Sequence, residues 1–311
     1  IRGLRNSVAK RPSSQVIDDL REALLYGEWG EQALIAALEK LDPKRLEAYV
    51  ASFWQGADAE VLVFGNYAPG IVEQLSGMLA EVIPPSTAPD LPDIKVLKLA
   101  ADEFLQYRVD VPHDDTVVAW YLQGAGDSWK DRAATALSGQ IMKSGFFQQL
   151  RTEQQLGYVV SAFSWPQRDV PGLVMLVQSP VADAPAVAVA METFMAGVLP
   201  SLDEDQFARH RAALVSEIRR PDKNMWERAE FYWQSIAKKQ WDFRGREALA
   251  EAVEALTLED WSDYFQRVFL APGRSLQVVT PGKWDKFPPG SSRQYDSAQA
   301  IKDGHGAYII E

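Results

Sequence analysis

Cysteine is absent from the 311 residues of this sequence. Disulfide bonds, cysteine-bound zinc, iron–sulfur clusters and thiol nucleophiles are therefore excluded. A chain of this length buries roughly 75% of the surface that its unfolded form exposes, so it can fold without covalent cross-links. The absence of cysteine does not distinguish a reducing from an oxidising compartment, and the localisation stays unknown at this point.

Histidine is scarce, and the three histidines, His113, His210 and His305, lie far apart in the sequence. Neither His-Glu-x-x-His nor His-x-x-Glu-His occurs, so a helical zinc site of that kind cannot form. We expect structural roles for all three, and no metal or cofactor bound by this chain. Nucleophile-elbow, P-loop and dinucleotide-binding glycine motifs are also missing. Acidic pairs such as Asp114-Asp115 are expected to be solvated.

Basic residues are fewer than acidic ones, and long apolar runs are absent. The net charge is −11, which argues against a nucleic-acid partner because nucleic acids bind clustered basic faces. No apolar run approaches the roughly 18 residues of a membrane span. The first residues, Ile1 to Leu4, resemble neither a signal peptide nor a natural start, so they say little about location.

Length and composition predict a globular protein of two domains. Domains average roughly 150 residues, and 47% hydrophobic and 24% charged residues are ordinary for globular chains. Pro84–Asp93 holds four prolines among small and acidic residues, which predicts a semi-rigid linker. We therefore expect a first domain over residues 1–84, a linker over 85–97, a second domain over 98–280, and a C-terminal tail over 281–311 that wraps the surface.

The first half is predicted to be mainly helical. Apolar residues recur at helical spacing over Ser14–Tyr26 and Gln32–Leu41, and Asp42-Pro43 begins a third helix. A further helix is expected over Pro69–Val82. Before it, Glu60–Asn66 is short, apolar and ended by Gly-Asn, which predicts a buried strand.

The second half has strands first and helices later. Strands are expected over Phe104–Val109, Thr116–Gln123, Tyr158–Trp165, Leu173–Gln178 and Ser275–Val279, and helices over Ser128–Gln149, Ala184–Val198, Glu204–Arg219, Asn224–Gln240, Arg246–Ala255 and Glu259–Phe269. The third and fourth of these strands should form an antiparallel hairpin. Runs of strands followed by runs of helices indicate an α+β fold, an antiparallel sheet with helices packed on one face.

The junction between the helix ending near Gln149 and the strand beginning at Tyr158 carries two candidate site residues, Arg151 and Tyr158. Gly157 interrupts the helix, so we expect Arg151 at a helix C-terminus and Tyr158 at a strand start, near one edge of the sheet. A phenol can donate to a developing oxyanion, and a guanidinium can hold carbonyls or carboxylates. Spacing alone favours a structural role for both residues, in which the arginine interacts with the C-terminal end of the helix dipole and the tyrosine packs in the strand.

The same stretch, FQQLRTEQQLGYVV from Phe147 to Val160, resembles the segment that marks the C-terminal half of insulysin- and pitrilysin-type zinc metallopeptidases, the M16 family. The similarity continues to Val177-Gln178-Ser179-Pro180. It also extends backward to Arg5-Asn6, Arg11-Pro12, Gln15, Trp29, Leu41, Leu46 and Phe64-Gly65-Asn66. In all, it covers Leu4 to about Phe269.

In that family four homologous α+β domains form two halves that close around a peptide, and the N-terminal half binds zinc on a His-x-x-Glu-His helix. The resemblance implies that this chain holds the later part of the third domain, truncated at its early strands, and the whole fourth domain. It implies the metal-free half of a zinc metalloendopeptidase, inactive alone, with a peptide substrate and the N-terminal catalytic half as partners. Arg151 and Tyr158 would contact substrate backbone and oxyanion.

The alternative function is a non-catalytic peptide-binding or scaffolding subunit that kept the fold. The two hypotheses differ in the N-terminal half. An enzyme needs an intact His-x-x-Glu-His motif there, whereas a scaffold carries a degenerate motif or lacks that half. Bacterial members of the family are often periplasmic, so a periplasmic location would suit a bacterial protein.

Overall fold

The computed structural model describes residues 3–4, 11–53, 59–83, 94–270 and 273–310. Its strands are β1 (Ile94–Leu97), β2 (Phe104–Arg108), β3 (Thr116–Gln123), β4 (Val159–Ser164), β5 (Gly172–Ser179), β6 (Ser275–Thr280), β7 (Arg293–Tyr295) and β8 (Ala307–Ile310). Six of them form one sheet in the order β4-β5-β3-β6-β2-β7, and β1 pairs with β8 in a separate two-stranded sheet. The pairs from β4 to β6 are antiparallel, whereas β2 runs parallel to both of its neighbours.

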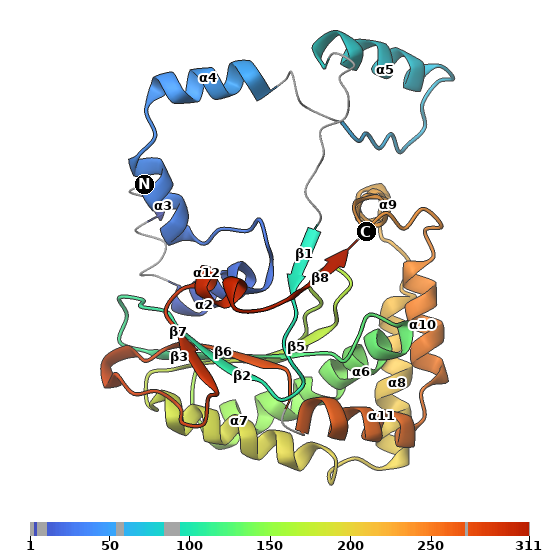
Figure 1. The fold of residues 1–311 in the computed structure, drawn as a ribbon. Helices are drawn as coiled ribbons and strands as arrows, with labels where there is room; N and C mark the ends of the chain where they lie inside the picture. Colours follow the sequence, from blue (N-terminus) through green and yellow to red (C-terminus); the bar gives the residue numbers. More distant parts are fainter. Residues whose placement is uncertain (1–2, 5–10, 54–58, 84–93, 271–272, 311) are drawn as a thin grey trace.

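Helices cover both faces of the six-stranded sheet (Figure 1). The helices are α2 (Pro12–Leu24), α3 (Glu31–Glu39), α4 (Pro43–Phe53), α5 (Ile71–Val82), α6 (Trp129–Phe146), α7 (Ala184–Val198), α8 (Glu204–Ile218), α9 (Met225–Ala237), α10 (Gly245–Ala255), α11 (Leu258–Phe265) and α12 (Ala298–Asp303). The larger core joins one sheet face to α6, α7, α8, α10 and α11. The predicted α+β class is confirmed, but α2 and α12 cover the second face, which the prediction left bare.

Helix α2 belongs to the core that includes the six-stranded sheet rather than to the first domain, where the sequence prediction placed it. Its side chains Val16, Leu20 and Leu24 are fully buried in one cluster with Leu105 of β2 and Val117 of β3. These helix positions are four residues apart, so they form one apolar stripe that matches the exposed face of a sheet. Periodicity found the helix but not the element against which it packs.

The predicted linker and tail also differ from the structure. Residues 84–93 of the linker lie outside the described residues, and Ile94–Leu97 is strand β1, paired antiparallel with β8. The predicted tail contributes β7, α12 and β8, and Ile301 of α12 is fully buried. Its short strands pair with segments far away in the sequence, so no local pattern announces them.

Helices α3, α4 and α5 bury none of their side chains, and Figure 1 shows them standing away from the sheet. The predicted strand Glu60–Asn66 is wrong: the segment is irregular and Val61 is 54% exposed. Its Phe64 ring instead meets the Tyr232 ring of α9 edge to face, with centroids 5.3 Å apart. No strand among the described residues lies beside this segment to complete a ladder. None of the helices in the described part of the chain combines the length and the apolarity that a bilayer crossing requires.

Asp19 is a carboxyl buried in the α2 core. It is 3% exposed, and its Oδ2 accepts a hydrogen bond of 3.0 Å from Gln15 Nε2. Burial raises the pKa of Asp19 to about 7, and the negative charge of Glu22 acts in the same direction. Because the folded-state pKa lies above the unfolded value of 3.8, folding favours the protonated form. The stability that this preference contributes is present at low pH and is lost as pH rises through 7.

We expect Asp19→Asn to raise the free energy of unfolding at pH 8 by on the order of 2 kcal/mol and to raise it clearly less at pH 4.5. An amide keeps an acceptor for Gln15 and carries no charge to bury. Denaturant unfolding of both proteins at the two pH values checks this. A difference between variant and wild type that is the same at both pH values would contradict the assignment.

Candidate functional site

The junction is built by a helix that widens before it ends. Ser128 caps the start of α6 by accepting from the backbone N–H of Asp131. At its C-terminal end α6 passes into a π-helical turn, η1 (Phe147–Glu153), which extends the predicted helix and places Arg151 in the last turn. The Leu156 N–H then donates to the Leu150 carbonyl at 2.9 Å and closes the turn. π-Helical turns are rare and occur often at functional sites.

Gly157 lets the link lie flat against β5. A Cβ added at this position would overlap the backbone carbonyl oxygen of Gln178. The next residues pair in register, Val159 with Gln178, so the close approach is part of the β4–β5 ladder. Gly157 was predicted only to interrupt the helix. The structure shows that this position needs a residue without a side chain.

Arg151 is attached to the peptide unit that precedes Tyr158. Its Nη1 donates to the Gly157 carbonyl at 2.9 Å, and its guanidinium carbon lies 5.8 Å from the centre of the Phe147 ring. The structure thus brings the two predicted residues to one junction, as expected. Their side chains take separate partners, because the phenol of Tyr158 extends toward β3.

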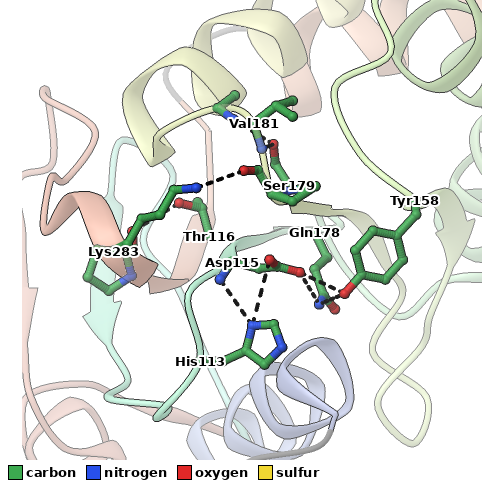
Figure 2. Close-up of polar contacts among 11 residues, drawn as sticks. His113, Asp115, Thr116, Tyr158, Gln178, Ser179, Val181 and Lys283 are labelled. Carbon is green, nitrogen blue, oxygen red and sulfur yellow. Dashed lines mark hydrogen bonds and ion pairs between the residues drawn. The ribbon is translucent and has the colours of Figure 1, made fainter.

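Tyr158 is 52% exposed, yet its hydroxyl lies in a network of three strands. Figure 2 shows the hydroxyl donating to Asp115 Oδ2 at 2.7 Å. Gln178 Nε2 donates to the same carboxylate oxygen at 2.8 Å and also to the Tyr158 hydroxyl. On the other side, the Asp115 N–H donates to His113 Nδ1 at 3.0 Å. The carboxylate comes from the residue before β3, the amide from the end of β5 and the phenol from the residue before β4.

The network fixes which partner carries the proton. Burial raises the pKa of Tyr158 to about 12, and the hydrogen bond and negative charge of Asp115 add to this effect. Burial works against ionisation of Asp115 too, but hydrogen bonds from Tyr158 and Gln178 and the positive charge of Lys283 outweigh it and lower that pKa. Near neutral pH the pair is therefore a phenol and a carboxylate. The one phenolic proton is shared with Asp115, so donating to another acceptor requires that this bond be exchanged.

Sequence reasoning missed Asp115 and Gln178. Asp115 is 7% exposed rather than solvated, and Gln178 is 2% exposed. The register Thr116 with Ser179 and Val159 with Gln178 brings both beside Tyr158. Only the pairing of β3 with β5 creates this contact, and nothing local in either segment predicts it. A polar residue just outside each apolar run was the available signal.

We expect Asp115→Asn to lower the pKa of Tyr158 toward its ordinary value near 10, because the variant removes a negative charge while keeping the buried position. NMR titration of ring-labelled tyrosine, assigned by comparison with Tyr158→Phe, measures the change. Asp114→Asn is the matched control, since Asp114 is the exposed neighbouring carboxylate. An equal fall in the control would show that the neighbouring charge is not the cause.

The described residues do not fit a zinc site. Among residues 3–4, 11–53, 59–83, 94–270 and 273–310, no three histidine, aspartate or glutamate side chains gather as metal ligands do. His305 is engaged elsewhere, with Nε2 2.9 Å from Glu103 Oε1 and Nδ1 2.6 Å from the Ile301 carbonyl oxygen.

Comparisons with known proteins agree on one group of relatives. The family model described as PQQ synthase PqqF-like, C-terminal lobe domain 4, matches residues 137–233, which include Arg151 and Tyr158. The insulin-degrading enzyme of Drosophila melanogaster is 25% identical over 293 residues, which is 90% of this chain and 29% of that protein. The insulin-degrading enzyme of Homo sapiens is 27% identical over 319 residues, covering 97% of this chain and 30% of the relative.

The fold has a match among solved structures. A crystal structure of pitrilysin superposes with a TM-score of 0.89 at 18% sequence identity, over 100% of this chain and 34% of that one. This likeness shows the shared fold. The chain spans 29% and 30% of the two curated relatives that it matches, so it corresponds to a part of each.

Proposed function

We propose that this chain supplies the metal-free side of a peptidase active site. The proposal rests on its similarity, in sequence and fold, to the C-terminal half of M16-type metallopeptidases. The zinc and the residues that activate water would belong to an N-terminal half of the same protein. The observation that carries the proposal is the junction itself: a protonated, half-exposed phenol and an arginine lie at one junction near the edge of the sheet, within the residues that the family model matches.

The two side chains are suited to different parts of the reaction. Peptide hydrolysis develops negative charge on the carbonyl oxygen, and a donor aimed at that oxygen stabilises the transition state more than the ground state. Tyr158 would supply that donor after exchanging its bond to Asp115. Arg151 uses one N–H on Gly157, and its remaining N–H groups suit substrate carbonyls, which they would hold in line with the reacting bond.

The exposed helices favour a larger assembly. Leu34 of α3, Tyr49 of α4 and Met78 of α5 are 42%, 60% and 59% exposed. Burying apolar surface stabilises a protein by roughly 25 cal/mol per Å², so such faces are normally covered. We propose that the remainder of the third domain packs on them.

Peptide cleavage by the full-length protein and by this segment alone tests the proposed function. We expect the full-length protein to cleave a quenched fluorescent peptide, a chelator to stop the cleavage, and residues 1–311 alone to show none. Chelator-sensitive cleavage by the segment alone would overturn the proposal. Binding of the peptide by the full-length protein without any cleavage would instead support the scaffolding function.

A further inference from the structure

Gln178 is held more firmly than the tyrosine that it contacts. Its backbone pairs on both sides, with Val117 of β3 and with Val159 of β4, and the residue is 2% exposed. Tyr158 lies in the link before β4 and is 52% exposed. A side chain on a regular strand is placed more precisely than one on a connecting segment. Gln178 is therefore the fixed member of this pair.

The amide of Gln178 bonds the phenol and the carboxylate at once. Its Nε2 donates to Asp115 Oδ2 at 2.8 Å and also to the Tyr158 hydroxyl oxygen, while that hydroxyl donates to the same Asp115 oxygen at 2.7 Å. A carboxylate only accepts, so the amide atom that faces it is the nitrogen. Figure 2 shows the three side chains converging. Their three polar atoms form a closed triangle.

The triangle places both partners on one side of the phenol oxygen. Three atoms at mutual hydrogen-bond distance subtend about 60° at each corner. In the described part of the chain the hydroxyl has no third partner, so its other side is available to a further acceptor. A phenol oxygen accepts while it donates its one proton. The proton can therefore turn away from Asp115 while the oxygen keeps its bond from Gln178.

The same amide limits the cost of that turn. Asp115 is 7% exposed, and a buried acceptor that loses its only donor is destabilised. Because Gln178 Nε2 also donates to Asp115 Oδ2, this oxygen keeps one bond when the phenolic proton leaves. Asp115 thus competes with a substrate for the proton, whereas Gln178 bonds the phenol oxygen in both positions of the proton.

We propose that Gln178 is the positioning residue of Tyr158: its amide holds the phenol oxygen in place while the hydroxyl proton turns from Asp115 to the carbonyl oxygen of the bound peptide. This inference deepens the proposed function and rests on it for the role of the tyrosine. One hydrogen bond replaces another in this step, and no covalent bond changes. Gln178 touches no reacting atom and acts only through the phenol.

Gln178→Met in the full-length protein removes the amide and keeps a side chain of similar length. We expect kcat for peptide cleavage to fall about 5- to 10-fold, the loss of one hydrogen bond. KM should change little, because the bond serves the transition state. Gln277→Met is the matched control, since Gln277 is a fully buried glutamine of the same sheet, and it should keep wild-type kinetics.

A double-mutant cycle shows whether Gln178 acts through the phenol. In a Tyr158→Phe background, Gln178→Met should change kcat less than about 2-fold, because no hydroxyl is left to position. A loss as large as in the wild-type background would overturn the proposal.

Asp115→Asn separates positioning from general disruption of the junction. A neutral amide accepts more weakly than a carboxylate, so it competes less for the phenolic proton. We expect kcat to rise about 2- to 5-fold in this variant, whereas Gln178→Met lowers it. Disruption would lower kcat in both. A fall in Asp115→Asn would overturn the proposal even if Gln178→Met did not fold.

The pKa of Tyr158 gives a readout that needs no turnover. The hydrogen bond from Gln178 lowers the pKa of Tyr158, because it stabilises the ionised phenol. In the Asp115→Asn protein, where this pKa comes within reach of NMR titration, adding Gln178→Met should raise it by about 0.5 to 1. An unchanged pKa would mean that Gln178 does not hold the phenol oxygen.

The inference and the proposed function can fail separately. If Tyr158→Phe loses turnover and Gln178→Met acts equally in both backgrounds, the role of Tyr158 stands and that of Gln178 is overturned. If Tyr158→Phe keeps wild-type turnover, the role of Tyr158 falls, and the inference falls with it.

Discussion

Replacing Tyr158 with phenylalanine is expected to lower kcat/KM for peptide cleavage by the full-length protein by about 100-fold, with its metal content unchanged. Removing one preformed oxyanion donor costs about this much in enzymes that cleave acyl bonds. The ring remains, so the packing at the start of β4 is retained. The loss should fall on kcat, because the proposed interaction strengthens as the reaction proceeds.

The measurement pairs steady-state kinetics with metal analysis of the same preparations. Tyr67→Phe is the matched control, since Tyr67 is 55% exposed and Tyr158 is 52% exposed. The control should keep wild-type kinetics. Wild-type turnover by Tyr158→Phe would show that the tyrosine hydroxyl takes no part in catalysis. Loss of metal from that variant would mean that lost activity reflects lost metal rather than the missing hydroxyl.

Gly157→Ala is expected to have the second large effect. The new methyl group would overlap the Gln178 carbonyl oxygen, whose strand β5 is paired on both sides and cannot easily withdraw. Over-packing of this kind costs typically 1–3 kcal/mol of stability. The link must shift to relieve it, so Tyr158 moves away from Asp115 and Arg151 loses its bond to residue 157. We expect kcat/KM to fall at least 10-fold, because small displacements of catalytic groups are costly.

Thermal unfolding and kinetics of Gly157→Ala, beside Gly197→Ala, check this effect. Gly197 lies in α7 and has nothing within 4 Å of an added Cβ. Alanine should raise stability there by roughly 0.5–1 kcal/mol, as expected for a glycine inside a helix. Wild-type stability and turnover in Gly157→Ala would show that the close approach to β5 does not constrain the junction.

Local patterns closely predicted the helices and strands of the second half of the chain. The bounds of β3 and α7 agree with the structure, because the apolar run of the strand and the helical apolar spacing are contained in those segments. Contacts between distant segments were not predictable. The burial of Asp115 depends on the pairing of β3 with β5, and the place of α2 depends on a sheet face about 80 residues later.

The candidate site was also predictable only in part. The resemblance of Phe147–Val160 to the M16 segment singled out Arg151 and Tyr158, and the similarity of this chain to insulin-degrading enzymes agrees with that resemblance. The roles of the two residues stay predictions, which the variants above test. The partners of the phenol came from the strand pairing, since neither the acidic pair Asp114-Asp115 nor the stretch Val177–Pro180 pointed to a contact with Tyr158. The predicted strand Glu60–Asn66 was wrong because an apolar run becomes a strand only when a neighbour is there to pair with it.

The packing of α2 against the end of the chain has a consequence for synthesis. Ile301 of α12 is buried with Leu20 of α2, and the Tyr26 hydroxyl donates to the Lys302 carbonyl at 3.1 Å. Helix α2 leaves the ribosome before the segment that forms its partner α12. A growing chain therefore carries an apolar helix that cannot be fully covered until translation of this region is complete, and such exposed surfaces are prone to aggregation. Chaperone demand should therefore be highest just before α12 emerges.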